Sequence, residues 1–319
     1  MESKNLMNTF FTSLPGYAGS TVIPSGGSHR IYSRVFFDDG RTEIGVENEN
    51  AAENASFIAI SRFLRGRGVR VPEVFAVSDD GRCYVQQDLG DKALHDCLDD
   101  RDMLMRVMHD LPALQFAGRD FDFSQCFSTR QFGPRIINFD LNYFKYCFLR
   151  PYGASFDENL LQDDLEHLCA DLLQVEGDTF FYRDFQSRNI MVHDGEPWYI
   201  DFQGAFRGPF YYDLCSFIYH ASSAFPDALR KELSDAYFDN LQTYRKVDRR
   251  TFDRNMGIFA LLRIMQALGA YGFRGLVEHK QYFTDCIPAA LRNLASVASD
   301  AYPYLRDLSV SLAGNVKKL

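Results

Sequence analysis

Several features are missing from this sequence, and each absence argues against a class of protein. No uninterrupted apolar run approaches the roughly 20 residues of a membrane-spanning helix, and the first twenty residues lack the basic start and long apolar core of a secretory signal. The seven cysteines form no CxxC pair and no zinc-ligand spacing, so we expect reduced, mostly buried thiols. We therefore expect a cytoplasmic protein with no membrane partner.

Basic residues are also fewer than acidic ones. Lys and Arg number 34 against 43 Asp and Glu, which gives a formal net charge of -9 at pH 7. Because nucleic-acid binding requires a basic face, this balance argues against a nucleic-acid partner. It does not argue against ATP, since a phosphate site is local. The 319 residues suffice for one large domain or two ordinary ones, with a core that needs no disulfides.

The first part of the chain is rich in strand signals. Runs of Val, Ile, Tyr and Phe alternate with turns rich in Gly and Asp, and one segment, 49–64, has apolar residues at helical spacing. The strand candidates are 20–22, 30–37, 43–46, 74–77 and 83–87.

Beyond Gly90 the pattern becomes helical. Segments 92–115 and 156–175 have helical periodicity, and the chain is almost wholly helical by pattern from Asp213 onward. The exception is a tight hairpin at 190–200. Because no long linker separates the two parts, we predict an α+β fold of two lobes that share a cleft, over residues 1–89 and 90–319.

The strongest functional signal is a pair of short motifs in the second lobe. The first is Tyr182-Arg183-Asp184-Phe185-Gln186-Ser187-Arg188-Asn189, and the second is Ile200-Asp201-Phe202 after the hairpin. The spacing from Asp184 to Asn189 is that of the protein kinase catalytic loop, and Asp201 stands where those enzymes place a metal-binding aspartate. Phosphoryl transfer needs a carboxylate beside the acceptor hydroxyl and oxygen ligands for Mg²⁺. Turn residues beside a hairpin would explain either motif alone, but hardly both in this order.

Around these motifs the chain resembles the aminoglycoside phosphotransferase and choline kinase-like branch of the protein kinase-like fold. Within that branch it is most similar to bacterial kinases of the anomeric hydroxyl of N-acetylmuramate and N-acetylglucosamine, through residues 183–189, 200–205 and 208–216. Gln186 stands where a His is common. The resemblance implies a two-lobed kinase of cell-wall sugar recycling that uses ATP and Mg²⁺. It makes Asp184 the catalytic base and Asn189 and Asp201 the metal ligands.

Two neighbours of the motifs have further implied roles. Asp213 usually braces the catalytic loop of this fold through backbone hydrogen bonds, although a helix N-cap before Leu214 is equally compatible. Arg188 is a candidate catalytic residue, because a guanidinium binds a phosphate or a substrate carboxylate in bidentate fashion. A solvated loop arginine is the alternative.

The first lobe offers a candidate nucleotide site. Glycines let the backbone approach phosphate and serine hydroxyls donate to it, so we predict that Ser25, Gly26, Gly27 and Ser28 cover the ATP phosphates. A turn without function has the same composition. The hinge of the fold runs after the last strand candidate, where backbone groups of Gln87 and Leu89 are candidates to bind the adenine edge.

The lysine that pairs the ATP phosphates in protein kinases is missing from the third strand candidate. The substitute that we predict is Arg30 or Arg34 on the preceding strand, positioned by Glu49 or Glu53 of the following helix. The absence also raises an alternative function, a nucleotide-sensing module without catalysis.

The acceptor pocket is expected before the catalytic loop, where segment 139–146 mixes aromatic residues with Asp, Asn and Lys. Such a surface suits a sugar, although ordinary helix packing gives the same pattern. We predict substrate contacts from Asp140 and Asn142. An aminoglycoside or amino-alcohol kinase is the alternative within the fold, and the basic residues between 230 and 250 disfavour its cationic acceptors.

Overall fold

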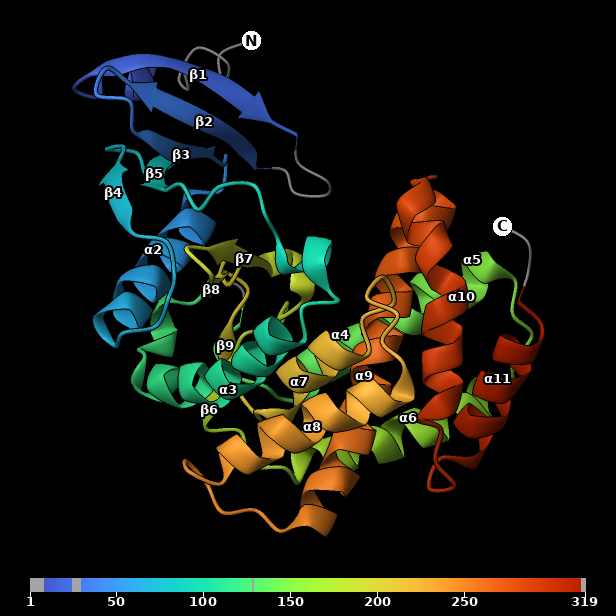
Figure 1. Ribbon diagram of the computed structural model, residues 1–319. Helices are drawn as coiled ribbons and strands as arrows, with labels where there is room; N and C mark the ends of the chain where they lie inside the picture. The colour runs from blue at the N-terminus through green and yellow to red at the C-terminus, as the bar shows by residue number, and fades with distance from the viewer. Residues whose placement is uncertain (1–8, 25–29, 128, 317–319) are drawn as a thin grey trace.

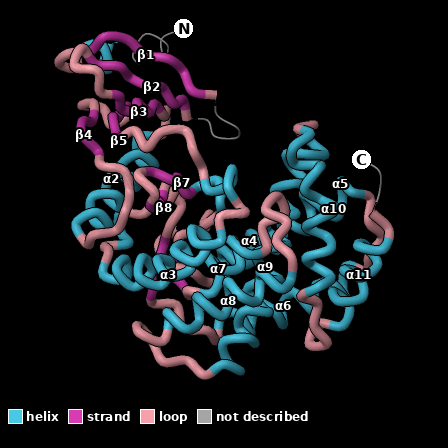
Figure 2. Tube along the Cα trace, viewed as in Figure 1, coloured by secondary structure: helices cyan, strands magenta, loops and turns pink. Residues whose placement is uncertain are grey.

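The computed structural model describes residues 9–24, 30–127 and 129–316, and it has the two-lobed α+β architecture of the protein kinase-like fold. An antiparallel sheet forms one end of the molecule and the helices gather at the other (Figure 1). Coloured by secondary structure, the two lobes separate into a strand-rich and a helix-rich part (Figure 2). The predicted fold class is therefore confirmed.

The N-lobe contains a five-stranded antiparallel sheet in the order β1-β2-β3-β5-β4. Its elements are β1 (Tyr17–Ile23), β2 (Ile31–Phe37), β3 (Thr42–Glu47), α2 (Ala51–Gly66), β4 (Val74–Val77) and β5 (Cys83–Gln87). Alternating residues of each strand face opposite sides of the sheet. Val35 and Val85 pack in an apolar cluster on one side, whereas Tyr84 faces α2 and stacks on Phe57 at a ring distance of 5.3 Å.

The C-lobe is mostly helical and also carries two small two-stranded sheets, β6-β9 and β7-β8. Its longer helices are α3 (Arg101–Ala117), α4 (Pro134–Tyr143), α6 (Glu158–Leu173), α7 (Tyr211–Ile218), α8 (Asp227–Leu241), α9 (Arg249–Tyr271), α10 (Gln281–Ser296) and α11 (Pro303–Gly314). The short helical elements are η1 (Leu94–Cys97), η2 (Gly118–Asp120), η3 (Phe123–Gln125), η4 (Phe144–Leu149), α5 (Arg150–Tyr152), η5 (Ser187–Asn189) and η6 (Gly272–Val277). The strands are β6 (Thr179–Phe181), β7 (Ile190–His193), β8 (Glu196–Tyr199) and β9 (Phe206–Gly208).

Two of these elements differ from the prediction. The helix expected over 92–115 is divided, because the side chain of Asp100 accepts a hydrogen bond from the N–H of Met103 and so begins α3 after the separate turn η1. The strand β9 was not predicted, since three residues are too few to show an alternating pattern. It pairs with β6 from Thr179↔Gly208 to Phe181↔Phe206.

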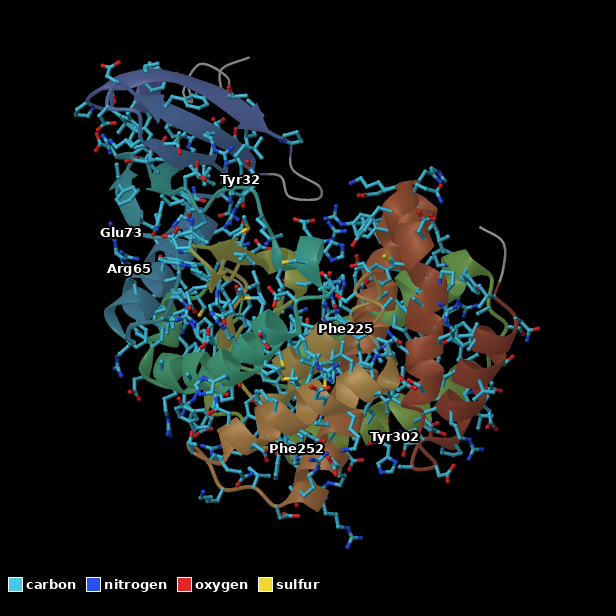
Figure 3. The ribbon with its side chains drawn as sticks, viewed as in Figure 1. Tyr32, Arg65, Glu73, Phe225, Phe252 and Tyr302 are labelled. Carbon is cyan, nitrogen blue, oxygen red and sulfur yellow. The ribbon has the colours of Figure 1, made fainter. Side chains whose placement is uncertain are left out.

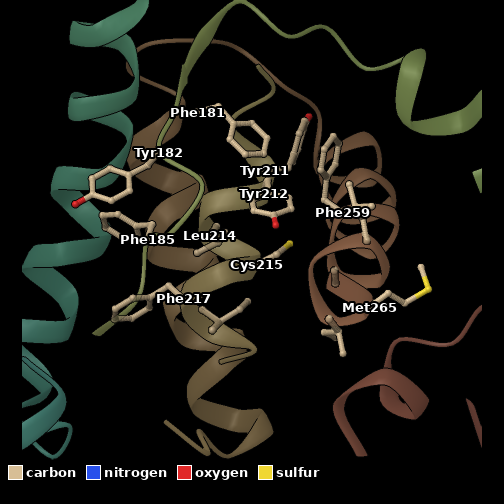
Figure 4. Packing of buried hydrophobic residues seen from close by; sticks show 14 of the residues in the cluster. Phe181, Tyr182, Phe185, Tyr211, Tyr212, Leu214, Cys215, Phe217, Phe259 and Met265 are labelled. Carbon is tan, nitrogen blue, oxygen red and sulfur yellow. The ribbon is translucent and has the colours of Figure 1, made fainter. Parts of the chain in front are cut away.

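The core of the C-lobe is organised around α9. This helix packs against α4, α7 and α10, and ring stacking of Tyr211 on Phe259 at 5.7 Å joins it to α7 (Figure 4). By length and composition alone, residues 249–277 could cross a membrane, but 67% of their most apolar window is buried within the molecule. The apolar character of α9 is therefore that of a central core helix.

Three contacts fix the connection between the lobes. The Arg34 guanidinium of β2 binds Asp88 at 2.7 Å and Asp91 at 2.8 Å, and the Val192 N–H of β7 donates to the Lys92 carbonyl at 2.8 Å. Gly90 lies in this connection with a φ of 81°, a value that favours glycine. We propose Gly90 as the boundary between the lobes.

Candidate active site

The segment that follows β6 is held from below by Asp213. Its two carboxylate oxygens accept hydrogen bonds from the backbone N–H groups of Tyr182 and Arg183, each at 3.0 Å, and one also accepts from Gln115 Nε2 at 2.9 Å. Burial raises the pKa of Asp213 to about 7, while these donors act in the opposite direction. The bracing interaction expected of Asp213 is therefore present. Its carboxylate does not cap α7, which begins two residues earlier at Tyr211.

The two sequence motifs meet at Asn189. Its Nδ2 donates to the backbone carbonyl of Asp184 at 2.9 Å and to Asp201 Oδ2 at 3.1 Å. The Ile200 N–H donates to the Asn189 carbonyl at 3.0 Å, which closes the base of the β7-β8 hairpin. The hairpin thus brings residues 184, 189 and 201 into one cluster, as their spacing predicted.

Asp201 is a carboxylate in an unusual setting. It has a φ of 67°, and Gln203 Nε2 donates to its Oδ1 at 2.8 Å. Burial raises its pKa, and the charge of Asp184 acts in the same direction, whereas that of Arg30 lowers it. No ion pair joins Asp201 to a basic side chain in the described ranges. A carboxylate in this position favours a bound cation.

Phe202, the aromatic residue after Asp201, packs against residues of both lobes. Phe202 stacks on Phe57 of α2 at a ring distance of 4.7 Å and meets Tyr182 edge-on at 6.0 Å. All three rings are buried. This packing fixes the position of the Asp201 backbone relative to α2.

Arg30, one of the predicted substitutes for the missing strand lysine, lies close enough to this cluster for its charge to act on Asp201. Arg30 Nη2 lies 3.1 Å from Glu53 Oε1 on α2, and the Arg30 side chain is only 2% exposed. The other oxygen, Glu53 Oε2, accepts a hydrogen bond from Asn48 Nδ2 at 3.0 Å. Of the pairings that the sequence left open, the structure forms Arg30 with Glu53.

The other arginine and the other glutamate that the sequence offered for this pairing have different partners. Arg34 binds the carboxylates of Asp88 and Asp91 at the connection between the lobes, so its charge is already paired. Glu49 Oε2 lies 3.7 Å from Arg82 Nη1, so this glutamate pairs with an arginine other than Arg30.

The predicted nucleotide contacts are distributed around the same sheet. The Gln87 N–H donates to the Glu73 carbonyl at 2.8 Å, and the Leu89 carbonyl lies 3.2 Å from His193 Nδ1, so these two backbone groups are already engaged. Tyr32 lies on the side of the sheet that faces the C-lobe (Figure 3). Burial raises the pKa of its hydroxyl, and the charge of Asp201 acts in the same direction. The segment Ser25-Gly26-Gly27-Ser28 lies outside the described residues.

The two predicted substrate contacts do not share a face of α4. Asp140 is 1% exposed, and both of its oxygens bind Arg183, at 2.8 and 3.3 Å. Asn142 is exposed and, two residues further on, points to nearly the opposite side of the helix. The structure therefore favours a positioning role for Asp140 beneath the catalytic loop, because its carboxylate is already paired and closed off from solvent.

Arg188 projects from the loop toward two residues that sequence reasoning missed. Its Nη2 donates to His95 Nε2 at 2.9 Å, and its Nε donates to the Tyr282 hydroxyl at 3.1 Å. Because His95 Nε2 accepts this bond, its proton is on Nδ1, which faces Ser187 Oγ at 3.2 Å. His95 and Tyr282 come from η1 and α10 and carry no motif, so only the folded chain shows them.

Comparison with known proteins identifies the class of this fold and site. The profile of the Phosphotransferase enzyme family matches residues 23–249, more than half of the chain, so the chain belongs to that family. The N-acetylmuramate/N-acetylglucosamine kinase of Neisseria meningitidis serogroup B is 25% identical over 206 residues, which are 62% of this chain and 60% of that relative. The match thus spans less than two thirds of that relative.

Solved structures agree on the fold. An amicoumacin kinase in complex with AMP-PNP, Ca²⁺ and Ami superposes with a TM-score of 0.64 at 12% identity, covering 97% of this chain and 96% of that one. A choline kinase from Cryptosporidium parvum gives 0.64 at 11% identity, with 97% and 99% covered. The Plasmodium vivax ethanolamine kinase gives 0.62 at 12%, with 92% and 86% covered. At these identities the likeness defines the fold alone.

Proposed function

We propose that this protein transfers the terminal phosphoryl group of ATP to the anomeric hydroxyl of an amino sugar of the N-acetylmuramate or N-acetylglucosamine type. Membership of a phosphotransferase family supports a small-molecule kinase. The observation that carries the proposal is the cluster in which Asn189 bonds both Asp184 and Asp201. The amino sugar is supported by the similarity to the Neisseria meningitidis kinase.

The donor set of the cluster fits Mg²⁺. Asn189 uses its amide nitrogen for both hydrogen bonds, which leaves its Oδ1 available beside the buried carboxylate of Asp201. Hard oxygen donors in small number suit Mg²⁺, which keeps waters and takes further ligands from substrate phosphates. When bound, the ion neutralises charge on the phosphates of ATP.

The protein's own groups supply the remaining steps. Asp184 accepts the proton of the acceptor hydroxyl as that oxygen attacks the phosphorus atom. Arg30, held by Glu53, contributes positive charge on the nucleotide side of Asp201, in place of a strand lysine. Asp213 accepts hydrogen bonds from the N–H groups of the two residues before Asp184. These bonds hold in place the backbone that carries the Asp184 carboxylate.

A coupled ADP-release assay tests this proposal. Purified protein with MgATP is offered N-acetylmuramate, N-acetylglucosamine, kanamycin, choline and ethanolamine, with Asp184→Asn alongside. We expect release with an acetylated amino sugar and a loss of about 100-fold or more in the variant, the contribution of a positioned base. Phosphorylation of choline or kanamycin instead would reassign the acceptor. ATP binding without any acceptor-stimulated, Asp184-dependent release would favour the sensing module.

A further inference from the structure

The N-lobe contains a cavity of about 390 Å³, which is within the size range of small-molecule sites. Glu47 of β3 and Cys83 of β5, which pair in the sheet, both line it, and Phe10 contributes an aromatic wall. Cys83 packs in the same apolar cluster as Phe11, whereas the next residue, Tyr84, stacks on α2. The sheet therefore separates the cavity from α2 and from the catalytic cluster (Figure 1).

Glu47 is a buried carboxylate without a partner. The residue is only 9% exposed, and its Oε2 accepts no hydrogen bond from the described part of the chain. Burial raises the pKa of Glu47, and the charges of Glu49 and Asp80 act in the same direction, whereas that of Arg82 lowers it. A buried carboxylate is costly to ionise unless a cation pairs with it. Glu47 therefore favours a cationic ligand in the cavity that it lines.

The charge of the cavity wall points to the same class of ligand. Its described lining has four carboxylates, those of Glu47, Glu49, Asp79 and Asp80, against one guanidinium, that of Arg82. Arg82 is already paired, with Asp80 at 3.3 Å and with Glu49 at 3.7 Å. No three of the described acidic, His or Cys side chains gather closely enough to hold a metal ion. The dispersed negative charge therefore suits an organic cation.

We propose that this cavity binds an aliphatic polyamine, with one ammonium group on Glu47 and another at Asp79. Glu47 is buried and Asp79 is exposed, so the two acids mark the inner end and the mouth of the cavity. Between them the methylene chain lies against Phe10 and Cys83, since both line the same space. Because the sheet separates this site from the catalytic cluster, the inference does not depend on the proposed function.

The first test is calorimetric titration of the protein with spermidine at about 0.15 M salt, where attraction between exposed charges is largely screened. We expect the wild-type protein to bind it. Glu47→Gln keeps the shape of the side chain without its charge, and it should weaken the affinity by about 10-fold or more. No binding to the wild-type protein would mean that Glu47 is simply protonated, and it would overturn the proposal. Equal affinities of the two proteins would do the same.

Glu43→Gln is the matched control on the same strand. Glu43 is four residues before Glu47 on the same face of β3, and it is also buried. Burial raises its pKa as well, but it pairs with Arg41 and is not among the residues that line the cavity. We expect this variant to bind spermidine as the wild-type protein does. Equal losses in the two variants would indicate a general attraction to acidic residues and contradict the proposal.

A second measurement examines the charge of the ligand and the place where it binds. Spermidine should raise the midpoint of thermal unfolding of the wild-type protein, because a ligand of the folded state stabilises it. The uncharged 1,8-octanediol has the same chain length and should not. A diol that stabilises as well as spermidine would overturn the ammonium contact.

The acidic residues of the catalytic cluster provide a control for the location. Asp184→Asn and Asp201→Ala should bind spermidine as the wild-type protein does, since both residues lie on the other side of the sheet from the cavity. A loss of binding in these variants, with binding retained in Glu47→Gln, would place the amine in the cleft between the lobes and overturn the proposal.

Discussion

Arg183 and Asp140 form a bidentate ion pair beneath the catalytic loop, at 2.8 and 3.3 Å, although 43 residues separate them. Burial raises the pKa of Asp140, and the adjacent guanidinium lowers it. Arg183 itself has a φ of 76° and donates its backbone N–H to Asp213. One residue next to Asp184 is thus fixed through both its side chain and its backbone.

Replacing Asp140 should destabilise the protein and misplace the loop. Asp140→Asn leaves a buried guanidinium without its counter-charge, and we expect unfolding to cost about 3 kcal/mol less. Asn142→Ala is the control on the same helix, since Asn142 is exposed. Thermal unfolding and ADP release measure both. A wild-type midpoint for Asp140→Asn would show that the pair has no structural role, and a raised KM for Asn142→Ala would restore Asn142 as a substrate contact.

Substitutions of Asp201 and of Asp184 should have different effects on nucleotide binding. Asp201→Ala removes the buried carboxylate of the proposed metal cluster, so Mg²⁺-dependent binding of AMP-PNP should weaken by about 10-fold or more. Asp184→Asn should bind the nucleotide as the wild-type protein does, because its proposed partner is the acceptor hydroxyl. Titration calorimetry with and without Mg²⁺ distinguishes the two. Equal losses in both variants would contradict the division of roles.

Arg30 and Arg34 offer a matched pair on one strand face. Arg30→Met should raise KM for ATP by about 10-fold, since it removes a charge-assisted contact. Arg34→Met should leave KM for ATP near the wild-type value and lower the midpoint of thermal unfolding, because it releases Asp88 and Asp91 at the lobe connection. The reverse result would return the phosphate contact to Arg34.

Asp213 should make stability depend on pH. Its pKa is about 7 in the folded protein, above its ordinary value of 3.8, because it is buried. Between these values the folded state keeps a proton that the unfolded chain releases, so the free energy of unfolding should fall as pH rises from about 4 to 7, by at most about 4 kcal/mol. Asp213→Asn has no such proton. Chemical denaturation of both proteins across this range should give a slope for the wild type that the variant lacks.

Two glycines at the α9–η6 segment should respond in opposite ways to alanine. A Cβ at Gly272 would lie 2.1 Å from the Cys147 carbonyl oxygen and 2.7 Å from Phe148 Cα, both backbone atoms that cannot move aside alone. Gly272→Ala should therefore destabilise by more than about 2 kcal/mol. A Cβ at Gly257 meets nothing within 4 Å, so Gly257→Ala should stabilise α9 by about 0.5–1 kcal/mol. Circular dichroism during thermal unfolding measures both.

The sequence predicted those parts of the structure that are encoded locally. The bounds of β4 and β5 agree with the prediction because alternation and flanking turns mark them within a few residues. The cluster of Asp184, Asn189 and Asp201 could also be predicted from the sequence, because short spacing and one hairpin bring the three residues together.

What the sequence could not show depends on packing between distant segments. The partner of Asp140 is 43 residues away, and nothing in the pattern of α4 distinguishes a buried carboxylate from a substrate contact. His95 and Tyr282 are single residues on the separate elements η1 and α10, without a motif of their own. They meet at Arg188 only because η1 and α10 both pack beside the loop.

The stacking of Phe202 on Phe57 bears on how a nucleotide enters. Because the rings lie 4.7 Å apart with an angle of 6° between their planes, α2 cannot rise from the C-lobe without separating them or carrying Asp201 along. Glu53 is on the same helix and pairs with Arg30, so the proposed phosphate contact would travel with that movement. Movement of α2 would therefore displace the proposed phosphate contact and the proposed metal ligand in a single event.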